Sequence, residues 1–203
     1  MTTLETVTGL FVNLEYPEPS MICIDDIAWG LSRLPRFCGQ TITNIPYNVA
    51  QHSIFVSEEV HRLRSSQPQD LMDTMEELVG PEATLKALLH DAAEAYTGDW
   101  PSPIKRIPSL TPIIAGIEAN LTQVIFEALG LTPMTDDEKR IIKYADRIAQ
   151  KIEAYNFMVS RGKDWPNMPD VSLERLQEFS PPMASLDSYK KFMGHFEYLK
   201  DCL

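Results

Sequence analysis

Four polar residues near the middle of the chain have types and spacings that suit metal binding or proton transfer. His90 and Asp91 are adjacent and follow an apolar segment, and Glu94 comes one helical turn after His90. Residues three or four positions apart lie on one side of a helix, so Glu94 is predicted to share a face with the His-Asp pair. Asp99 follows a glycine that should end this helix. These groups can bind a divalent ion or transfer protons; the alternative is a core histidine beside a solvated acidic helix end.

Two residues of the same types occur on other predicted helices. His52 lies on an apolar stripe, where a histidine is more often a packed core residue than a ligand. Asp146 lies beside another apolar stripe, where a carboxylate is costly unless it is paired or bound to a cation. Together with His90 and Asp91 they would supply two imidazoles and two carboxylates. Such a set suits a divalent ion (Mn, Co, Ni, Fe, Zn or Mg) and leaves positions open for water and substrate.

The elements that must position these residues are predicted to be helices. Apolar residues repeat with helical spacing between residues that favour helix starts and residues that favour helix ends. The predicted helices cover residues 25–34, 48–64, 82–96, 111–129, 136–159, 172–179 and 185–202. Asp25 or Asp26 is predicted to cap the first helix and Asn48 the second, and Thr135 with Glu138 forms a capping box at the fifth.

The remaining segments contain no run that favours a long strand. Residues 65–73 are predicted to form a surface loop, and residues 1–23 an irregular segment in which a short hairpin is the alternative. We therefore predict an all-α fold with a single domain over residues 1–203. Its core would cover residues 25–160, with C-terminal helices over residues 171–203 packed on it. The metal site would lie between the central helices.

Composition and charge limit the classes of partner. The chain has 203 residues, of which 44% are hydrophobic, and no apolar run approaches the ~20 residues that span a bilayer. Three scattered cysteines and the absence of a signal sequence favour a cytoplasmic protein with reduced thiols and no membrane partner. A net charge of −11 disfavours long nucleic acids. It permits a small phosphate compound, because a metal ion and a few local cations can override the overall charge.

The order of these residues resembles the HD-domain phosphohydrolases. The resemblance covers roughly residues 25–160. It is closest to the branch of bacterial 5'-deoxynucleotidases and phage HD-domain nucleotide hydrolases. The segments that carry it are YNVAQHS at 47–53, LHDAAEAYTGD at 89–99 and KYAD at 143–146. The resemblance implies an HD-domain helical bundle that needs no organic cofactor. It also implies that the divalent metal is bound by the four residues His52, His90, Asp91 and Asp146.

The resemblance also implies roles for residues around the metal. Glu94 matches the carboxylate that orients or activates the attacking water. Asp99 matches the acidic residue that faces the sugar and phosphate of the substrate. Arg36 matches an arginine that contacts the nucleotide. Phe37 follows it where the bacterial deoxynucleotidases have tryptophan, so base and sugar preference cannot be carried over. Lys105 is a candidate phosphate contact, with a surface lysine as the alternative.

Two histidines, His61 and His195, match nothing in the motif and are predicted to be surface or packing residues.

Three functions remain open at this point. The first is a metal-dependent hydrolase of deoxynucleoside 5'-phosphates. It would release phosphate from a monophosphate or triphosphate from a dNTP, with dATP among the candidate substrates. The second is an HD hydrolase of another phosphoester, such as a cyclic or signalling nucleotide. The third is a non-catalytic nucleotide-sensing scaffold, against which Glu94 and Asp99 argue because a structural metal needs only ligands. We also expect a homo-oligomer, either a dimer or a larger assembly.

Overall fold

The computed structural model describes residues 2–65 and 81–203, which are mostly helical, as predicted. The helices are η1 (Pro19–Met21), α1 (Ile24–Arg33), η2 (Arg36–Gly39), α2 (Val49–Ser65), α4 (Pro81–Leu88), α5 (Glu94–Thr97), α6 (Ser102–Lys105), α7 (Thr111–Leu129), α8 (Asp136–Phe157), α9 (Leu173–Gln177) and α10 (Ser185–Asp201). The surface loop predicted over residues 65–73 lies outside the described residues, except that residue 65 ends α2.

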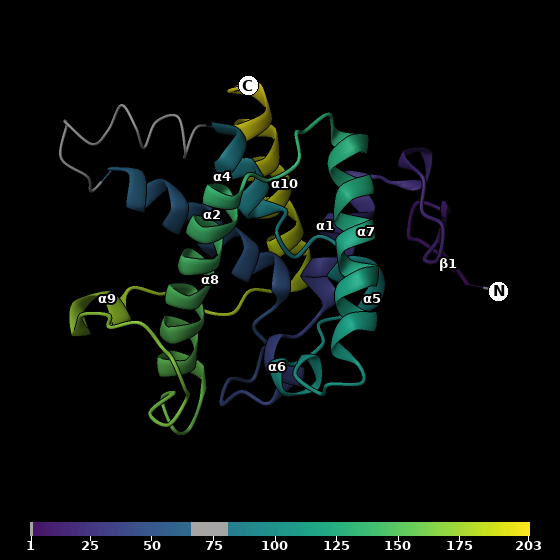
Figure 1. Ribbon diagram of the computed structural model, residues 1–203. Coiled ribbons are helices and arrows are strands. Elements are labelled where there is room, and N and C mark those ends of the chain that lie inside the picture. Colours follow the sequence, from purple (N-terminus) through teal and green to yellow (C-terminus); the bar gives the residue numbers. More distant parts are fainter. Residues whose placement is uncertain (1, 66–80) are drawn as a thin grey trace.

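Helix α2 packs against both α4 and α8, and α1 packs against α5 and α10. In Figure 1, α2, α4 and α8 form one group, and α7 and the N-terminal segment lie to one side of it. A small apolar core joins α2, α4 and α8, and it consists of Val56, Val60, Ala83, Ala87, Ile142, Ala145 and Ala149. The three segments predicted to carry the metal ligands are therefore held against one another by apolar contacts.

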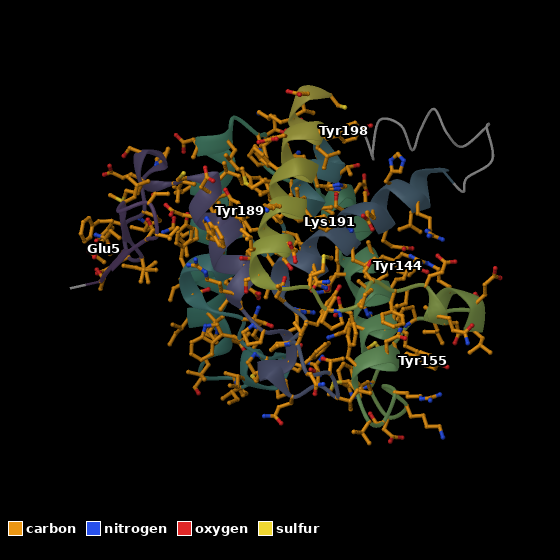
Figure 2. The ribbon with its side chains drawn as sticks, turned by 180° about the vertical axis from the view of Figure 1, so that it is seen from behind. Glu5, Tyr144, Tyr155, Tyr189, Lys191 and Tyr198 are labelled. Carbon is orange, nitrogen blue, oxygen red and sulfur yellow. The ribbon has the colours of Figure 1, made fainter. Side chains whose placement is uncertain are left out.

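The C-terminal helix α10 covers the other side of α1. The ring of Tyr189 stacks on the ring of Trp29 with their centroids 4.1 Å apart, and the Tyr189 hydroxyl donates a hydrogen bond to Asp25. Figure 2 shows Tyr189 from behind, on the side of α10 that faces α1. This contact ties the end of the chain to the helix that follows the N-terminal segment.

The N-terminal segment contains the short hairpin that the sequence left as an alternative. Strands β1 (Thr3–Glu5) and β2 (Phe11–Asn13) pair antiparallel, with Leu4 opposite Val12. The prediction that Asp25 or Asp26 caps α1 is wrong, because the N-cap is Cys23 and makes no side-chain cap bond. The Asp26 carboxylate instead accepts hydrogen bonds from Thr6 and Thr8 in the hairpin turn.

Two other predicted caps are present. The Asn48 side chain accepts a hydrogen bond from the backbone N–H of Gln51 and so caps the first turn of α2. Thr135 and Glu138 form the predicted capping box at the start of α8. Because α2 and α8 carry His52 and Asp146, these caps help to fix the positions of two of the predicted ligands.

The single helix predicted over residues 82–96 is wrong. Helix α4 ends at Leu88 and α5 begins at Glu94, and between them the N–H groups of Leu89, His90 and Ala92 bond carbonyls three residues earlier. These bonds form the tighter turn typical of a 3₁₀ helix. The Ala87 carbonyl accepts a hydrogen bond from His90 Nδ1 at 2.8 Å, so a side chain takes an acceptor that a continuous α-helix would use. The His-Asp pair consequently lies in a turn between two helices.

Helix α5 crosses α1 at a glycine, and this close approach gives a testable prediction. A Cβ atom added to Gly30 would lie 2.8 Å from Ala95 Cβ and 3.0 Å from the Ala95 carbonyl oxygen. We expect Gly30→Ala to lower the free energy of unfolding by about 1–3 kcal/mol, as for other overpacked sites. It should also displace Glu94, which precedes Ala95. Chemical denaturation measures the loss of stability.

The matched control is Gly116→Ala in α7, where an added Cβ would meet no described atom within 4 Å. Alanine favours a helix over glycine by roughly 0.5–1 kcal/mol, so this variant should be at least as stable as the wild type. Equal stability of Gly30→Ala and the wild type would contradict the close packing of α1 and α5.

Candidate active site

The four residues predicted to bind metal lie together between α2, α8 and the turn that joins α4 to α5. His52 Nε2 lies 3.2 Å from Asp146 Oδ1 and 3.5 Å from Asp91 Oδ2. His90 Nε2 lies 3.2 Å from Asp91 Oδ2. Single ligand atoms of His52, His90 and Asp146 all lie within 4.8 Å of one another. These two Nε2 atoms and the Asp146 carboxylate thus converge, and Asp91 lies beside them within 3.5 Å of both Nε2 atoms.

The other ring nitrogen of each histidine is held by an acceptor. His90 Nδ1 bonds the Ala87 carbonyl, and His52 Nδ1 lies 2.7 Å from Glu153 Oε1. Because these acceptors favour a proton on Nδ1, both Nε2 atoms are left with lone pairs, and neither has a hydrogen-bond partner among the described residues. Metal-binding histidines commonly donate their second N–H to a carboxylate or carbonyl in this way. The donor set therefore fits a divalent ion.

A proton competes with a metal ion for His52. Burial and the charge of Arg36 lower the pKa of His52, but the nearby carboxylates of Glu153 and Asp146 outweigh them and raise this pKa to about 10. Metal ions bind only the neutral imidazole, so binding here releases a proton. Metal affinity should therefore increase with pH.

Arg36 lies beside the metal-ligand cluster and is buried, so it is not the surface residue that a loop position would suggest. Its guanidinium lies 3.5 Å from Glu153, 3.7 Å from Asp99 and 4.0 Å from Asp91. Burial lowers the pKa of Arg36, but the three carboxylates raise it above its ordinary value, so the side chain is fully charged. The site therefore contains a fixed positive charge next to the proposed metal position.

The backbone around Arg36 explains why the side chain points inward. The Arg36 N–H donates to the Tyr47 carbonyl, and Pro35 and Asn48 form an isolated antiparallel bridge, which ties η2 to the start of α2. The next residue, Phe37, has a φ of 55°, in the left-handed region that non-glycine residues seldom adopt. Such conformations are frequent at functional sites.

Phe37 lies beside Arg36, half-buried. Its ring centroid is 5.4 Å from the Arg36 guanidinium carbon, and it meets the ring of Trp165 edge to face with centroids 5.7 Å apart. The sequence did not single out Trp165, because it lies in a proline-rich loop more than a hundred residues after Phe37. The two rings provide an apolar surface next to the buried cation.

Glu94 and Lys105 form an ion pair at the other side of the cluster. Glu94 is 3% exposed, and its Oε1 accepts a hydrogen bond from Lys105 Nζ at 2.9 Å. Lys105 Nζ also lies 2.9 Å from Glu118 on α7. Burial, Asp91 and Asp99 raise the pKa of Glu94 to about 8, although Lys105 opposes them. The structure thus pairs Lys105 with a carboxylate of the site. The sequence had suggested a phosphate contact or a surface lysine instead.

Sequence reasoning missed Glu153, which is 1% exposed on α8. A signal for it exists, because Glu153 follows Ala149 by four positions and continues the apolar stripe that positions Asp146. The two unmatched histidines lie outside the cluster. His195 is half-buried with Nε2 3.1 Å from Ser57 Oγ, and His61 is exposed.

Comparisons with known proteins agree with this arrangement. A protein-family model described as 5'-deoxynucleotidase YfbR-like matches residues 30–197. The Escherichia coli K12 protein YfdR is 30% identical over 201 residues, which covers 99% of this chain and 97% of that protein. A 5'-deoxynucleotidase of Cronobacter sakazakii is 30% identical over 115 residues, or 50% of this chain and 56% of that protein.

A solved structure shares the fold. It is the cyanophage S-2L HD phosphohydrolase DatZ bound to dA and one catalytic Zn²⁺ ion, with a TM-score of 0.50 and 22% sequence identity. The match covers 86% of this chain and 95% of DatZ. It confirms the predicted HD-domain helical fold. Within residues 2–65 and 81–203, no helix has the length and apolarity that a membrane span requires.

Proposed function

Because the chain belongs to the YfbR-like 5'-deoxynucleotidase family of HD-domain phosphohydrolases, we propose that it hydrolyses deoxynucleoside 5'-phosphates with the aid of a bound divalent metal. The observation that supports this most strongly is the convergence of two Nε2 atoms and the Asp146 carboxylate, with Asp91 and a buried arginine beside them. A nucleotide-sensing scaffold would need the ligands but not Glu94, whose buried Oε2 has no hydrogen-bond partner in the described part of the chain.

The proposed metal ligands are His52, His90, Asp91 and Asp146. A divalent ion held there would polarise a phosphoryl oxygen and lower the pKa of a bound water. DatZ contains one catalytic Zn²⁺ ion, and zinc is among the ions that this imidazole and carboxylate set suits.

Glu94 is the proposed general base. A group that accepts a proton during the reaction works best when its pKa is near the working pH, and the pKa of Glu94 is raised to about 8. Lys105 occupies one oxygen of the Glu94 carboxylate, which leaves the second oxygen to orient the attacking water or to take its proton.

Arg36, Asp99 and Phe37 are the proposed substrate contacts. A guanidinium can bind two phosphate oxygens at once, and Arg36 is already buried and charged, so little desolvation is needed when substrate binds. Asp99 lies 3.7 Å from Arg36 and would face the sugar next to the phosphate. Phe37, with Trp165 at its edge, would pack against the sugar or base.

We propose a deoxynucleoside 5'-monophosphate as the substrate, because the family model and the Cronobacter sakazakii relative are both described as 5'-deoxynucleotidases. Release of triphosphate from a dNTP, dATP included, is the second candidate. A longer phosphate chain would need a cation beyond Arg36, and Lys105, which pairs with Glu94 and Glu118, is the candidate for that contact.

Identification of the products tests the proposal. The purified protein, loaded with Mn²⁺, Co²⁺ or Zn²⁺, would be incubated with deoxynucleoside monophosphates, dNTPs and ribonucleotide controls, and the products followed by phosphorus NMR. Phosphate released from the monophosphates supports the first candidate, and triphosphate from dNTPs supports the second. If no deoxynucleotide is hydrolysed by protein whose metal content has been verified, the proposed function is wrong.

Replacing Lys105 distinguishes a role in lowering the pKa of Glu94 from a role in binding phosphate. Its positive charge lowers the pKa of Glu94, so Lys105→Met should raise that pKa. A general base must be deprotonated to act, and activity rises as the pH passes its pKa. We therefore expect the acidic limb of the profile of kcat/KM against pH to move to higher pH in this variant.

The control is Lys139→Met, since Lys139 is exposed on α8 and pairs with Asp136 away from the cluster. Its profile should match that of the wild type. If Lys105→Met raises KM for the nucleotide and leaves the acidic limb in place, Lys105 contacts phosphate and does not tune Glu94.

A further inference from the structure

Glu153 is the most buried carboxylate of the site, and it lies behind the proposed metal ligands. Its Oε1 is 2.7 Å from His52 Nδ1, and its Oε2 is 3.5 Å from an Arg36 guanidinium nitrogen. Oε2 has no hydrogen-bond partner among the residues that the structure describes. Burying a carboxylate is costly unless opposite charges and hydrogen bonds offset the loss of water. The two charged groups that offset this cost are His52, a proposed metal ligand, and Arg36, a proposed phosphate contact.

We propose that Glu153 is a positioning residue that fixes the His52 ring for metal binding and holds the Arg36 guanidinium at the phosphate position. The inference rests on the proposed metal centre and extends it, because Glu153 is not one of the proposed ligands and makes no proposed contact with substrate. A single carboxylate would then set the distance and orientation between metal and phosphate.

The effect on His52 follows from hydrogen-bonding chemistry. A carboxylate only accepts, so Oε1 favours the tautomer with the proton on Nδ1 and directs the Nε2 lone pair toward Asp146 and Asp91. Outer partners of this kind orient metal-binding histidines, and their loss typically weakens metal binding by about 10–100-fold.

The effect on Arg36 follows from geometry. Glu153, Asp99 and Asp91 lie on three different segments, and each is within 4.0 Å of the guanidinium. Asp99 and Asp91 have proposed roles of their own, with the substrate and the metal. Within the described residues, the ion pairs of Glu153 are with His52 and Arg36, so its charge remains available to Arg36 when metal and substrate are bound.

A purely structural role is the alternative, and the same helix contains an example of it. Glu138 on α8 is also buried, and both its oxygens accept hydrogen bonds from the buried Lys86 at 2.8 and 3.0 Å. It also closes the capping box with Thr135. Glu138 contacts none of the proposed site residues through these bonds, so Glu138→Gln is a matched control for a buried carboxylate on α8.

The choice of variants depends on the space around Glu153. The side chain also borders a cavity of about 350 Å³ whose other walls include Tyr47, Gln51 and Phe157. A short side chain at position 153 would let water enter and replace the lost acceptor. Glu153→Leu fills the space without an acceptor, whereas Glu153→Gln keeps an acceptor oxygen for His52 and removes only the charge.

The experiment measures three quantities for the full-length protein and its variants. The dissociation constant for Co²⁺ comes from competition with a coloured chelator, and KM from deoxynucleotide hydrolysis. The His52 tautomer comes from nitrogen-15 NMR of the ring in metal-free protein, at a pH where the ring is neutral. We expect the Co²⁺ dissociation constant to rise about 10-fold in Glu153→Gln and about 100-fold in Glu153→Leu. The Nδ1-protonated tautomer should persist in Glu153→Gln and be lost in Glu153→Leu, and KM should rise in both.

Glu138→Gln should leave the Co²⁺ affinity and the His52 tautomer unchanged even if it lowers the melting temperature. Co²⁺ affinities and KM within about twofold of the wild type in both Glu153 variants would overturn the inference. If Glu153→Leu does not fold, the isosteric Glu153→Gln decides by the same criterion. A wild-type protein that binds no Co²⁺ would overturn the proposed function together with this inference, so the two failures are distinguishable.

Discussion

Replacing His90 or Asp146 with alanine is expected to remove the bound metal and reduce phosphohydrolase activity to the level of chelator-treated protein. Each residue contributes one donor to a cluster whose atoms lie within 4.8 Å of one another, and they come from different segments. Loss of either therefore leaves an incomplete ligand set. Elemental analysis measures the metal content, and circular dichroism verifies that the helices persist.

His195→Ala is the matched control for these variants. His195 is half-buried and bonds Ser57, and it lies outside the cluster, so its replacement should retain the metal. Stability provides a second measurement, because a ligand present at 100 times its dissociation constant and bound only to the native state stabilises it by about 2.7 kcal/mol. Metal should therefore raise the melting temperatures of the wild type and His195→Ala, and leave those of His90→Ala and Asp146→Ala unchanged. A full metal complement in both His90→Ala and Asp146→Ala would refute the ligand set.

Glu94→Gln is expected to keep the metal and the substrate affinity and to lose on the order of 10²–10⁴ in kcat, as for the loss of a general acid–base group. Glutamine retains the shape of the side chain and an oxygen that can accept from Lys105, but it cannot take a proton from water. The effect should therefore appear in kcat and not in metal content, which separates Glu94 from the ligands. Single-turnover hydrolysis of the preferred deoxynucleotide measures it directly.

Glu118→Gln is the control for this variant, because Glu118 is the other carboxylate that pairs with Lys105. Glu118 lies on α7 and has no proposed role in proton transfer. The kcat of Glu118→Gln should therefore stay close to that of the wild type. A Glu94→Gln protein with wild-type kcat would remove Glu94 from the mechanism and return the scaffold function to consideration.

The grouping of the proposed ligands could be predicted from the sequence because its signals are local. His90, Asp91 and Glu94 lie within five residues after an apolar segment, and helical periodicity placed His52 and Asp146 on or beside inner faces. Helix caps at Asn48 and Thr135 are equally local, since each depends on residues within four positions.

The break between α4 and α5 could not be predicted in the same way. Leucine and alanine dominate residues 85–95 and favour a continuous helix. The hydrogen bond from His90 Nδ1 to the Ala87 carbonyl opposes this helical preference. It forms when the imidazole is turned toward His52 and Asp146. Tertiary contacts at the site therefore override the local preference.

The partners of the cluster required the three-dimensional structure. Arg36 follows a proline in a short turn, a context in which an arginine is usually exposed, and its burial depends on three carboxylates distant in the sequence. Trp165 reaches Phe37 only through the loop after α8, and Glu118 reaches Lys105 only through the packing of α7. Contacts of this kind leave no periodic or short-range pattern in the sequence.

Titration of the metal-free protein with a single divalent metal, followed by deoxynucleotide hydrolysis, tests the central claim most directly. The protein would be stripped with a chelator, its residual metal verified by elemental analysis, and its activity measured as Mn²⁺, Co²⁺ or Zn²⁺ is restored. The proposed site predicts negligible hydrolysis without metal and a rise in activity in proportion to bound metal until the site is saturated. Full hydrolysis by the stripped protein, or none by the fully loaded protein, would contradict a metal-dependent deoxynucleotide hydrolase.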